Sequence, residues 1–574
     1  MQPFDPIAME VFSNRLLTIT EEMGITLVRG SFSPNIKERQ DCSVALFDYK
    51  GRLISQASHI PMHLGALEGG VRTILRRYEI DAIDDGDVFM CNDAYLAGGT
   101  HSPDITLVTP IFWEGQLRFF ATNLGHHSDV GGSTPGSVSP TARTIYDEGL
   151  RIPLVKVMRA GQLESDILDM VTSNSREPED RSFDLKVQIA ANERGRRLVL
   201  ALLENHGLEQ VEKSIEDVLT YTERRLRNRI AALGDGTSTY TTYLDDDGFG
   251  GEPVAIVVTL TVDGESLTVD FEGTGPQARG AYNMPEAALN ATVYYCVKTM
   301  LDPELMPNEG MSAAITITAP KGTLANPVFP GAIGMRSCTA QPFSGAIIGA
   351  FNALLPEQRQ MAAGNDAMPA LVVSGQSWRR PGTYVYVETI GGGAGALSDH
   401  DGADGTHVHI TNSSNLPVEA LENEYPLLVE EYCLIPDSGG AGRYRGGLGI
   451  AREIRVLADE TFFYASSEKT VIKPGGLHGG DEGSNAQIIY APGMAQEKYL
   501  PANQPGTVIP KGTSMRLQTP GGGGFGPPSQ RLPEALAADL RSGKHSPEFA
   551  EAHYGLTLYR AAIDLLDREG IGAR

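Results

Sequence analysis

A short polar segment of the chain places a histidine and a carboxylate three residues apart. His101 and Asp104 stand in the sequence GGTHSPD, and a run of apolar residues begins directly after Asp104. Pro103 disfavours a helix that starts at His101, so the pair is expected in a tight turn at the start of a strand. An imidazole and a carboxylate on so short a turn can point at the same atom, as the ligands of a divalent metal do.

A second polar segment follows the next apolar run and carries His126, His127 and Asp129. If the two runs form a β-hairpin around Glu114-Gly115, the open end of the hairpin brings His126 beside Asp104. Two imidazoles with one or two carboxylates suit Zn²⁺, Mn²⁺ or Fe²⁺, whereas Ca²⁺ and Mg²⁺ prefer oxygen ligands. The alternative is that these histidines only cap turns, but three of the 12 histidines fall in this one stretch, which favours metal binding.

Three further residues could join this site. Asp41 lies just before a strand-like run, and spacing alone favours its interpretation as a turn residue, although a strand beside the hairpin would make it a fourth ligand. His59 and His63 alternate with apolar residues, which is typical of histidines in a protein core.

The pattern of apolar residues predicts the helices and strands around these side chains. Asp5 and Pro6 are suited to start a helix whose apolar residues recur at helical spacing: Ile7, Val11, Leu16, Ile19, Met23 and Leu27. Turn signals predict hairpins at 49–51 and 114–115, followed by two helices over 184–233 with a break at His206-Gly207.

The composition and the predicted secondary structure change twice in the rest of the chain. A hairpin with an Asp-Gly turn and a helix over 286–301 precede a stretch from 310 to 525 that is rich in Gly, Pro and short strand-like runs, and helices return at the end. We therefore expect an α+β fold with a strand-rich, Gly/Pro-dense C-terminal half and helical segments at the N-terminus, middle and C-terminus. The predicted regions are 1–180 with the metal site, 181–310, 311–528 and a helical tail 529–574.

Composition excludes several classes of function. The chain has 574 residues and a formal net charge of −25, so a nucleic-acid or membrane-surface partner is not expected. The five cysteines are scattered, and neither a signal peptide nor a transmembrane run is found, which predicts a cytoplasmic protein without a disulfide framework.

The motifs of the chain resemble the hydantoinase B/oxoprolinase family, which includes subunits of ATP-dependent hydantoinases, 5-oxoprolinases and lactamases. The resemblance runs in order from about residue 4 to 530 through ERQDCSVALFD, IPMHLGAL, NDAYLAGGTHSPDITLVTP, GHHSDVGG, SREPEDRSFDLKVQIAANERG, YNMPEAALNATVYY, KGTLANPVFPGAIG and DSGGAGRYRGGLG. It implies that Asp41, His101, Asp104 and His126 hold one divalent metal, with Zn²⁺ favoured over Mn²⁺ or Fe²⁺. His127 and Asp129 then become catalytic candidates that orient a ligand or handle a proton.

The resemblance also implies an activity shared between two components. A hydantoinase A-type partner binds ATP and Mg²⁺ and phosphorylates the amide oxygen of a hydantoin, 5-oxoproline or lactam, and this chain hydrolyses the activated ring, with a metal-bound water as nucleophile. A heterotetramer of two plus two subunits is the expected assembly. The chain has no Walker A sequence, in keeping with a nucleotide that belongs to the partner.

Two alternatives stay open at this point. One is an acetone-carboxylase-like alpha subunit, disfavoured because that class is usually longer, and the other is a structural partner without catalysis, disfavoured because structural zinc sites prefer cysteine. The run at 521–526 is interpreted as a tight glycine turn, and Gly391–Gly393 with Gly446-Gly447 as sites of close packing. Arg443 and Arg445 suit either phosphate binding or structural ion pairs.

Overall fold

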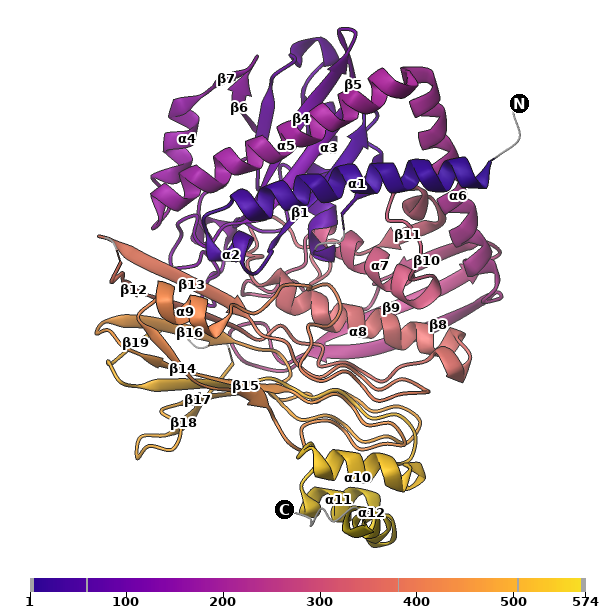
Figure 1. Cartoon of the computed structure of the whole chain (residues 1–574), viewed down its shortest axis with the longest axis vertical. Helices are drawn as coiled ribbons and strands as arrows, with labels where there is room; N and C mark the ends of the chain where they lie inside the picture. Colours follow the sequence, from indigo (N-terminus) through magenta and orange to yellow (C-terminus); the bar gives the residue numbers. More distant parts are fainter. Residues whose placement is uncertain (1–4, 58–59, 380, 503–504, 569–574) are drawn as a thin grey trace.

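The first layer of the molecule is a seven-stranded antiparallel sheet in the order β2-β1-β5-β4-β3-β6-β7 (Figure 1). The computed structural model describes residues 5–57, 60–379, 381–502 and 505–568, so His59 lies outside the described residues. The strands are β1 Cys42–Asp48, β2 Leu53–Gln56, β3 Val88–Cys91, β4 Asp104–Trp113, β5 Gln116–His126, β6 Val155–Arg159 and β7 Gln162–Leu163. Both predicted hairpins are confirmed, with Gly51 and Gly115 at positive φ in their turns.

Helices cover both faces of this sheet. Alternate residues of β1 point to opposite sides, so Val44 packs with the helices of one face and Phe47 with the helix of the other. The helices are α1 Pro6–Gly30, α2 Pro34–Lys37, α3 Leu64–Arg77, α4 Ser165–Thr172, α5 Pro178–His206 and α6 Leu208–Ala231. Figure 1 shows α1 and α5 side by side across one face, while α3 belongs to the core cluster of the other. The predicted break before α6 is confirmed at Gly207, which has a φ of 76°.

The N-terminal helix begins as the sequence predicts but buries less of its apolar stripe. The Asp5 carboxylate accepts hydrogen bonds from two backbone N–H groups of the first turn. Of the six apolar residues at helical spacing, four are buried, whereas Ile7 and Val11 are 75% and 54% exposed. The first turns of α1 lie at the edge of the molecule (Figure 1).

A second layer contains a four-stranded sheet and two long helices. The strands are β8 Gly236–Leu244, β9 Val254–Asp263, β10 Ser266–Asp270 and β11 Ile315–Thr318, and the helices are α7 Glu286–Leu301 and α8 Arg336–Leu354. The predicted Asp-Gly turn between β9 and β10 and the helix α7 are confirmed. Helix α8 was not predicted, because Pro342 lies inside it and it falls within the Gly- and Pro-rich stretch that was expected to be β structure. Its apolar face joins the same core cluster as β8 and β9.

Two further sheets pack face to face in the C-terminal half. They have the orders β13-β12-β16-β19 and β14-β15-β20-β17-β18, and residues of both sheets share one apolar core. Their strands are β12 Ala370–Gln376, β13 Thr383–Thr389, β14 Leu427–Leu434, β15 Ile450–Val456, β16 Thr461–Ser466, β17 Gln487–Tyr490, β18 Lys498–Leu500, β19 Thr507–Ile509 and β20 Ser514–Gln518, with the short helix α9 Val418–Glu424 at one end.

The glycine runs pack extended backbone segments against one another. A Cβ on Gly446 would lie 1.9 Å from the carbonyl oxygen of Gly522, and one on Gly393 would lie 2.0 Å from that of Gly447. The predicted close packing is therefore confirmed. The prediction of a tight turn at 521–526 is wrong over its first four residues, because Gly521 to Gly524 have no positive φ and their N–H groups donate to neighbouring segments.

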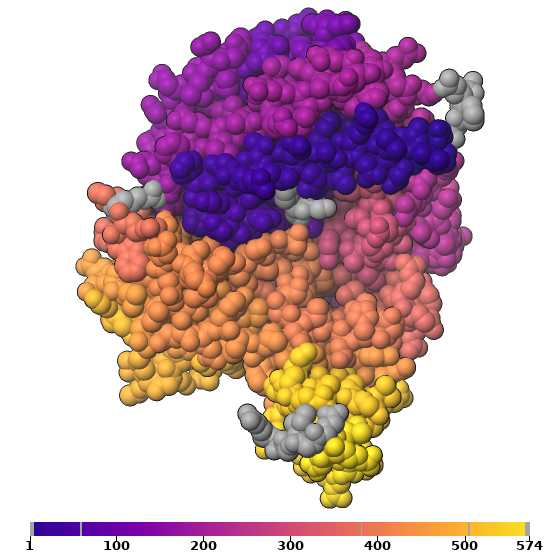
Figure 2. All heavy atoms as spheres, viewed as in Figure 1, coloured from indigo at the N-terminus to yellow at the C-terminus, as the bar shows by residue number. Residues whose placement is uncertain are grey.

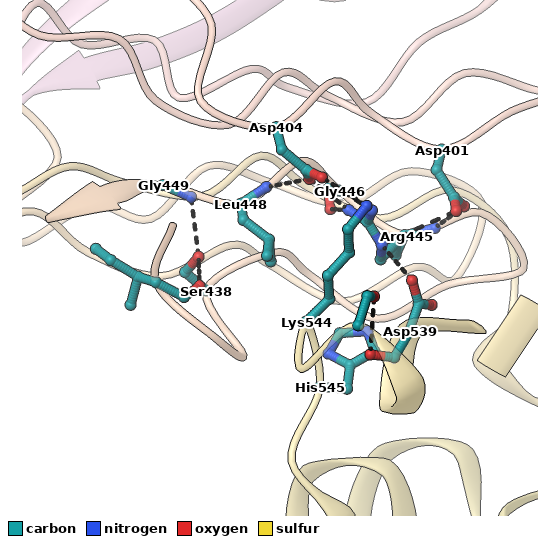
Figure 3. A network of polar contacts seen from close by, with 12 residues as sticks. Asp401, Asp404, Ser438, Arg445, Gly446, Leu448, Gly449, Asp539, Lys544 and His545 are labelled. Atoms are coloured by element: carbon teal, nitrogen blue, oxygen red, sulfur yellow. Dashed lines mark hydrogen bonds and ion pairs between the residues drawn. The ribbon is translucent and has the colours of Figure 1, made fainter. Parts of the chain in front are cut away.

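Three helices end the chain and are held by buried ion pairs. They are α10 Pro533–Arg541, α11 Pro547–Tyr554 and α12 Leu556–Arg568, and Figure 2 shows them in yellow, projecting from the body of the molecule. Arg445 donates to Asp404 at 2.7 Å and to Asp539 of α10 at 3.0 Å (Figure 3). Of the two roles that the sequence left open, Arg445 therefore has the structural one. Among the described helices, none is both long and apolar enough to cross a membrane.

Candidate metal centre

The register of β4 and β5 brings the two polar segments together. Asp104 and His126 are direct partners across the two strands, at the open end of the hairpin that turns at Glu114 and Gly115. The predicted hairpin and its consequence are therefore confirmed. On the other side of β5, β1 pairs with it so that the His126 N–H donates to the backbone carbonyl of Asp41 at 3.0 Å.

Three of the predicted ligand atoms converge on one point. The Nε2 atom of His101 lies 3.1 Å from Oδ1 of Asp104 and 3.2 Å from Nδ1 of His126, and this Nδ1 lies 3.0 Å from the same carboxylate oxygen. All three residues are buried. Ligands bonded at about 2.0 Å to a tetrahedral ion are separated by about 3.3 Å, so this donor set fits a small divalent metal such as Zn²⁺.

The second oxygen of Asp104 is held by protein donors. Oδ2 accepts hydrogen bonds from Thr100 Oγ1 at 2.6 Å and from Arg336 Nη2 at 2.7 Å. Burial alone would raise the pKa of Asp104, but the nearby His101 and Arg336 outweigh it and hold this pKa well below its usual range. The carboxylate therefore stays ionised, with Oδ1 turned toward the imidazoles.

The imidazole of His101 is presented in its neutral form. Burial, with a further contribution from Arg336, lowers the pKa of His101 to about 4. Its Nδ1 lies 3.2 Å from the carbonyl oxygen of Gly334, which fixes the ring and leaves the Nε2 lone pair facing Asp104 when Nδ1 carries the proton. The loop at Gly334 is held in turn by Glu148, whose Oε1 accepts from the N–H groups of Ile333 and Gly334 at 2.7 and 2.6 Å.

Asp41 is connected to the His101–Asp104–His126 cluster through His63. His63 places its Nε2 atom 3.5 Å from Oδ1 of Asp41 and 3.9 Å from Oδ1 of Asp104. Asp41 thus borders the site but lies outside the three-residue cluster, and its role as a fourth ligand stays a prediction. His63 was interpreted from the sequence as a core histidine; it is buried, but it faces the two carboxylates rather than apolar side chains alone.

The two predicted catalytic residues point elsewhere. The ring nitrogens of His127 lie 2.6 Å from Arg181 Nη1 and 3.0 Å from Gln188 Oε1. The Asp129 carboxylate accepts from three backbone N–H groups and from the guanidinium of Arg176 at 2.7 Å. These contacts join α5 and its preceding loop to the end of β5, so the structure gives both residues supporting contacts, and their catalytic roles stay predictions.

A cavity of about 70 Å³ opens beside the cluster. Its polar lining includes Arg39, Asp41, His63, His101, His126 and Arg336. Its apolar lining includes Ile60, Met62, Met335, Met368, Val372 and Val387, which come from the segments before α3, α8 and β12 and from strands β12 and β13. A site with a polar and an apolar part suits a small, mostly carbon ring that carries one polar group.

Two residues of the cavity, Arg336 and His63, were not predicted as site residues, for different reasons. Arg336 follows β11 in a stretch that was expected to be β structure, and only the position of α8 brings it to Asp104. For His63, the segment IPMHLGAL belongs to the family motifs and could have signalled a site residue, but its alternation with apolar residues favoured a core role.

The sequence as a whole matches a known family. The model of the hydantoinase B/oxoprolinase family matches residues 5–528. The chain belongs to this family. An uncharacterized protein of Methanocaldococcus jannaschii is 35% identical over 98% of each chain, and a Pseudomonas protein named as the B component of a putative D-/L-hydantoinase is 32% identical over 97% of this chain and 96% of that protein. 5-Oxoprolinase 1 of Arabidopsis thaliana is 34% identical over 91% of this chain, which spans 42% of that protein.

Two solved structures share the fold of this hydantoinase B family chain. The ATP-dependent caprolactamase from Pseudomonas jessenii is 28% identical, with a TM-score of 0.90 over 96% of both chains. An acetone carboxylase in its nucleotide-free form has a TM-score of 0.88 over 99% of this chain and 83% of that one. At 19% identity, the second likeness concerns the fold alone.

Proposed function

We propose that this chain is the hydrolytic component of an ATP-dependent cyclic amide hydrolase. It opens the ring of a hydantoin, 5-oxoproline or lactam after a hydantoinase A-type partner has phosphorylated the amide oxygen. The observation that carries the proposal is the convergence of His101, Asp104 and His126 beside a largely apolar cavity. Relatives named as a component of a hydantoinase, a 5-oxoprolinase and a caprolactamase support this class of substrate.

The residues of the chain prepare the site for an ion and for the ring. Thr100 and Arg336 hold one oxygen of Asp104 and leave the other toward the imidazoles. A divalent ion bound there, for which we favour Zn²⁺ over Mn²⁺ or Fe²⁺, would supply Lewis-acid chemistry at neutral pH. The apolar wall would hold the methylene groups of the ring and exclude bulk water.

His63 is placed to handle a proton in this reaction. Its Nδ1 lies 3.1 Å from the hydroxyl oxygen of Ser43, and that hydroxyl can donate to the Cys42 carbonyl at 2.8 Å. In this arrangement Nδ1 carries the proton and Nε2, beside Asp41, is free to accept one. We therefore assign to His63 the role of proton acceptor during ring opening.

The ATP-binding step belongs to a separate component in this proposal. We expect the chain to act with a hydantoinase A-type subunit in a two-plus-two assembly in the cytoplasm. The relative named as one component of a hydantoinase supports a partner, and the Arabidopsis 5-oxoprolinase, which is more than twice as long as the matched segment, is consistent with both components in one chain.

The proposal is tested by assay of the chain together with its partner subunit. ADP, phosphate and a ring-opened acid should appear without bicarbonate. The acid is an amino acid from a lactam and an N-carbamoyl amino acid from a hydantoin. His101→Ala should abolish ring opening while the circular dichroism spectrum and the pairing of the subunits are retained. Strict dependence on bicarbonate and a ketone would instead favour the carboxylase alternative, and full activity of His101→Ala would remove the catalytic proposal.

A further inference from the structure

Two buried guanidinium groups line the cavity beside the metal cluster. Arg39 lies two residues before Asp41, and Arg336 begins helix α8; their exposed fractions are 1% and 4%. In the described part of the chain, the Nε atom of each has no hydrogen-bond partner. A buried N–H without an acceptor is energetically unfavourable, so two such donors in one cavity wall indicate a missing acceptor.

The remaining nitrogens of both side chains are fixed by the protein. Arg39 donates from Nη1 to the Val387 carbonyl at 2.7 Å and from Nη2 to Thr389 Oγ1 at 2.9 Å. Arg336 donates from Nη2 to Asp104 at 2.7 Å. The two guanidinium planes are therefore held before any ligand arrives, and little side-chain entropy would be lost on binding.

The first turn of α8 belongs to the same wall. Gly334, Met335, Arg336, Ser337 and Cys338 all line the cavity. The helix continues to Leu354, and no side chain of the described residues caps its N-terminus. The helix dipole gives this start a partial positive charge, which favours an anion. The N–H groups of Met335, Arg336 and Cys338 already donate to backbone carbonyls, so the first turn contributes through its dipole rather than through free donors.

The formal charges of the site favour an anion with two negative charges. Asp41 and Asp104 contribute two negative charges, and Arg39 and Arg336 balance them with two positive charges. A divalent ion at the His101–Asp104–His126 cluster would leave a net charge of about +2 in a buried cavity. A phosphate monoester matches this charge, and arginine is well suited to its tetrahedral oxygens.

We propose that Arg39, Arg336 and the first turn of α8 form the subsite that binds the phosphoryl group of the activated substrate. This inference rests on the proposed function for its substrate, but the binding of inorganic phosphate can be measured without turnover. The subsite would place the phosphorylated carbon beside the metal cluster and leave the ring to the apolar wall.

The test measures binding of inorganic phosphate to the full-length chain loaded with Zn²⁺, by isothermal titration calorimetry. Arg39→Lys and Arg336→Lys keep the positive charge but remove the unpartnered Nε–H, and Arg197→Lys serves as a matched control because Arg197 is exposed on α5. Metal content and circular dichroism are recorded for every variant. Acetate and bicarbonate are titrated as competing anions.

We expect phosphate to bind the original chain at millimolar concentration or below, and each of the two test variants to weaken it at least tenfold at unchanged metal content. Arg197→Lys should leave binding within twofold. Absence of phosphate binding in the original chain, equal binding in all variants, or a preference for acetate or bicarbonate would overturn the subsite. If a variant loses its metal, the subsite is judged instead by whether the original chain binds phosphate more tightly than acetate and bicarbonate. ATP-dependent ring opening without phosphate binding would reject the subsite alone, and phosphate binding without ring opening would reject the proposed function alone.

Discussion

Replacement of Glu148 by glutamine tests how the loop behind His101 is held. Glu148 is fully buried, its Oε1 accepts two backbone N–H groups, and its Oε2 has no partner among the described residues. Burial raises the pKa of Glu148 from 4.5 to about 8, despite the two N–H donors. The carboxyl is therefore protonated at neutral pH, and the glutamine amide, which has the same shape, preserves the oxygen that faces Ile333 and Gly334.

The expected signature is a pH-dependent difference in unfolding free energy. Between pH 4.5 and about 8 the folded chain keeps a proton that the unfolded chain has lost, so the contribution of Glu148 to stability falls as the pH rises. The slope is about 1.4 kcal/mol per pH unit, which gives about 3 kcal/mol between about pH 5.5 and 7.5. Glutamine does not titrate, so Glu148→Gln lacks this pH-dependent loss. The unfolding free energy of Glu148→Gln minus that of the original chain should therefore rise by about 3 kcal/mol from about pH 5.5 to 7.5.

The measurement is urea unfolding followed by the fluorescence of Trp113 in β4, in a Trp378→Phe background that removes the exposed second tryptophan. Glu265→Gln, at an exposed glutamate, serves as the control and should show no pH-dependent difference. A difference between Glu148→Gln and the original chain that is constant with pH, or that changes in the opposite direction, would show that Glu148 is ionised in the folded protein and refute the reasoning.

Three further predictions concern buried polar side chains. Asp104→Asn leaves the buried guanidinium of Arg336 unpaired and should destabilise the metal-free chain by about 3–5 kcal/mol, whereas adding Arg336→Met should recover most of this loss in urea unfolding without restoring metal content. His63→Gln should lower the rate of ring opening by about 10²–10⁴-fold at unchanged metal content, and a rate within twofold of the original would remove its role as proton acceptor. Arg445→Ala should release α10 from the glycine-rich segments and accelerate proteolysis after residue 529; cleavage at the original rate would contradict the anchoring role of this ion pair.

Local patterns in the sequence were sufficient for the hairpin that carries the metal ligands. The alternation of apolar residues and the Glu114-Gly115 turn set the register of β4 and β5, and a direct pairing of Asp104 with His126 follows from that register. The helices α1, α5, α6 and α7 were predicted for the same reason, since capping residues and helical periodicity act within a few turns of chain. The family resemblance added Asp41, which spacing alone assigned to a turn.

Other features of the site depend on contacts between residues far apart in the sequence. Arg336 reaches Asp104 because α8 packs on the sheet of β8 and β9, and neither a motif nor a period in the sequence encodes that distance. The role of His63 could not be predicted for the same reason, since a buried histidine gives the same local sequence pattern whether its ring faces apolar side chains or carboxylates. His127 stands next to a predicted ligand in sequence, yet the alternation of side chains along the end of β5 turns it toward Arg181 and Gln188.

Turns, strand register and short motifs were enough to predict the α+β composition, the family, and the convergence of His101, Asp104 and His126. Contacts between distant segments, in contrast, set which charged groups share the cavity with these ligands, how the glycine-rich segments pack, and which neighbouring histidine faces the site. Packing between distant segments sets the burial of each group, and burial controls both its protonation and its need for a partner.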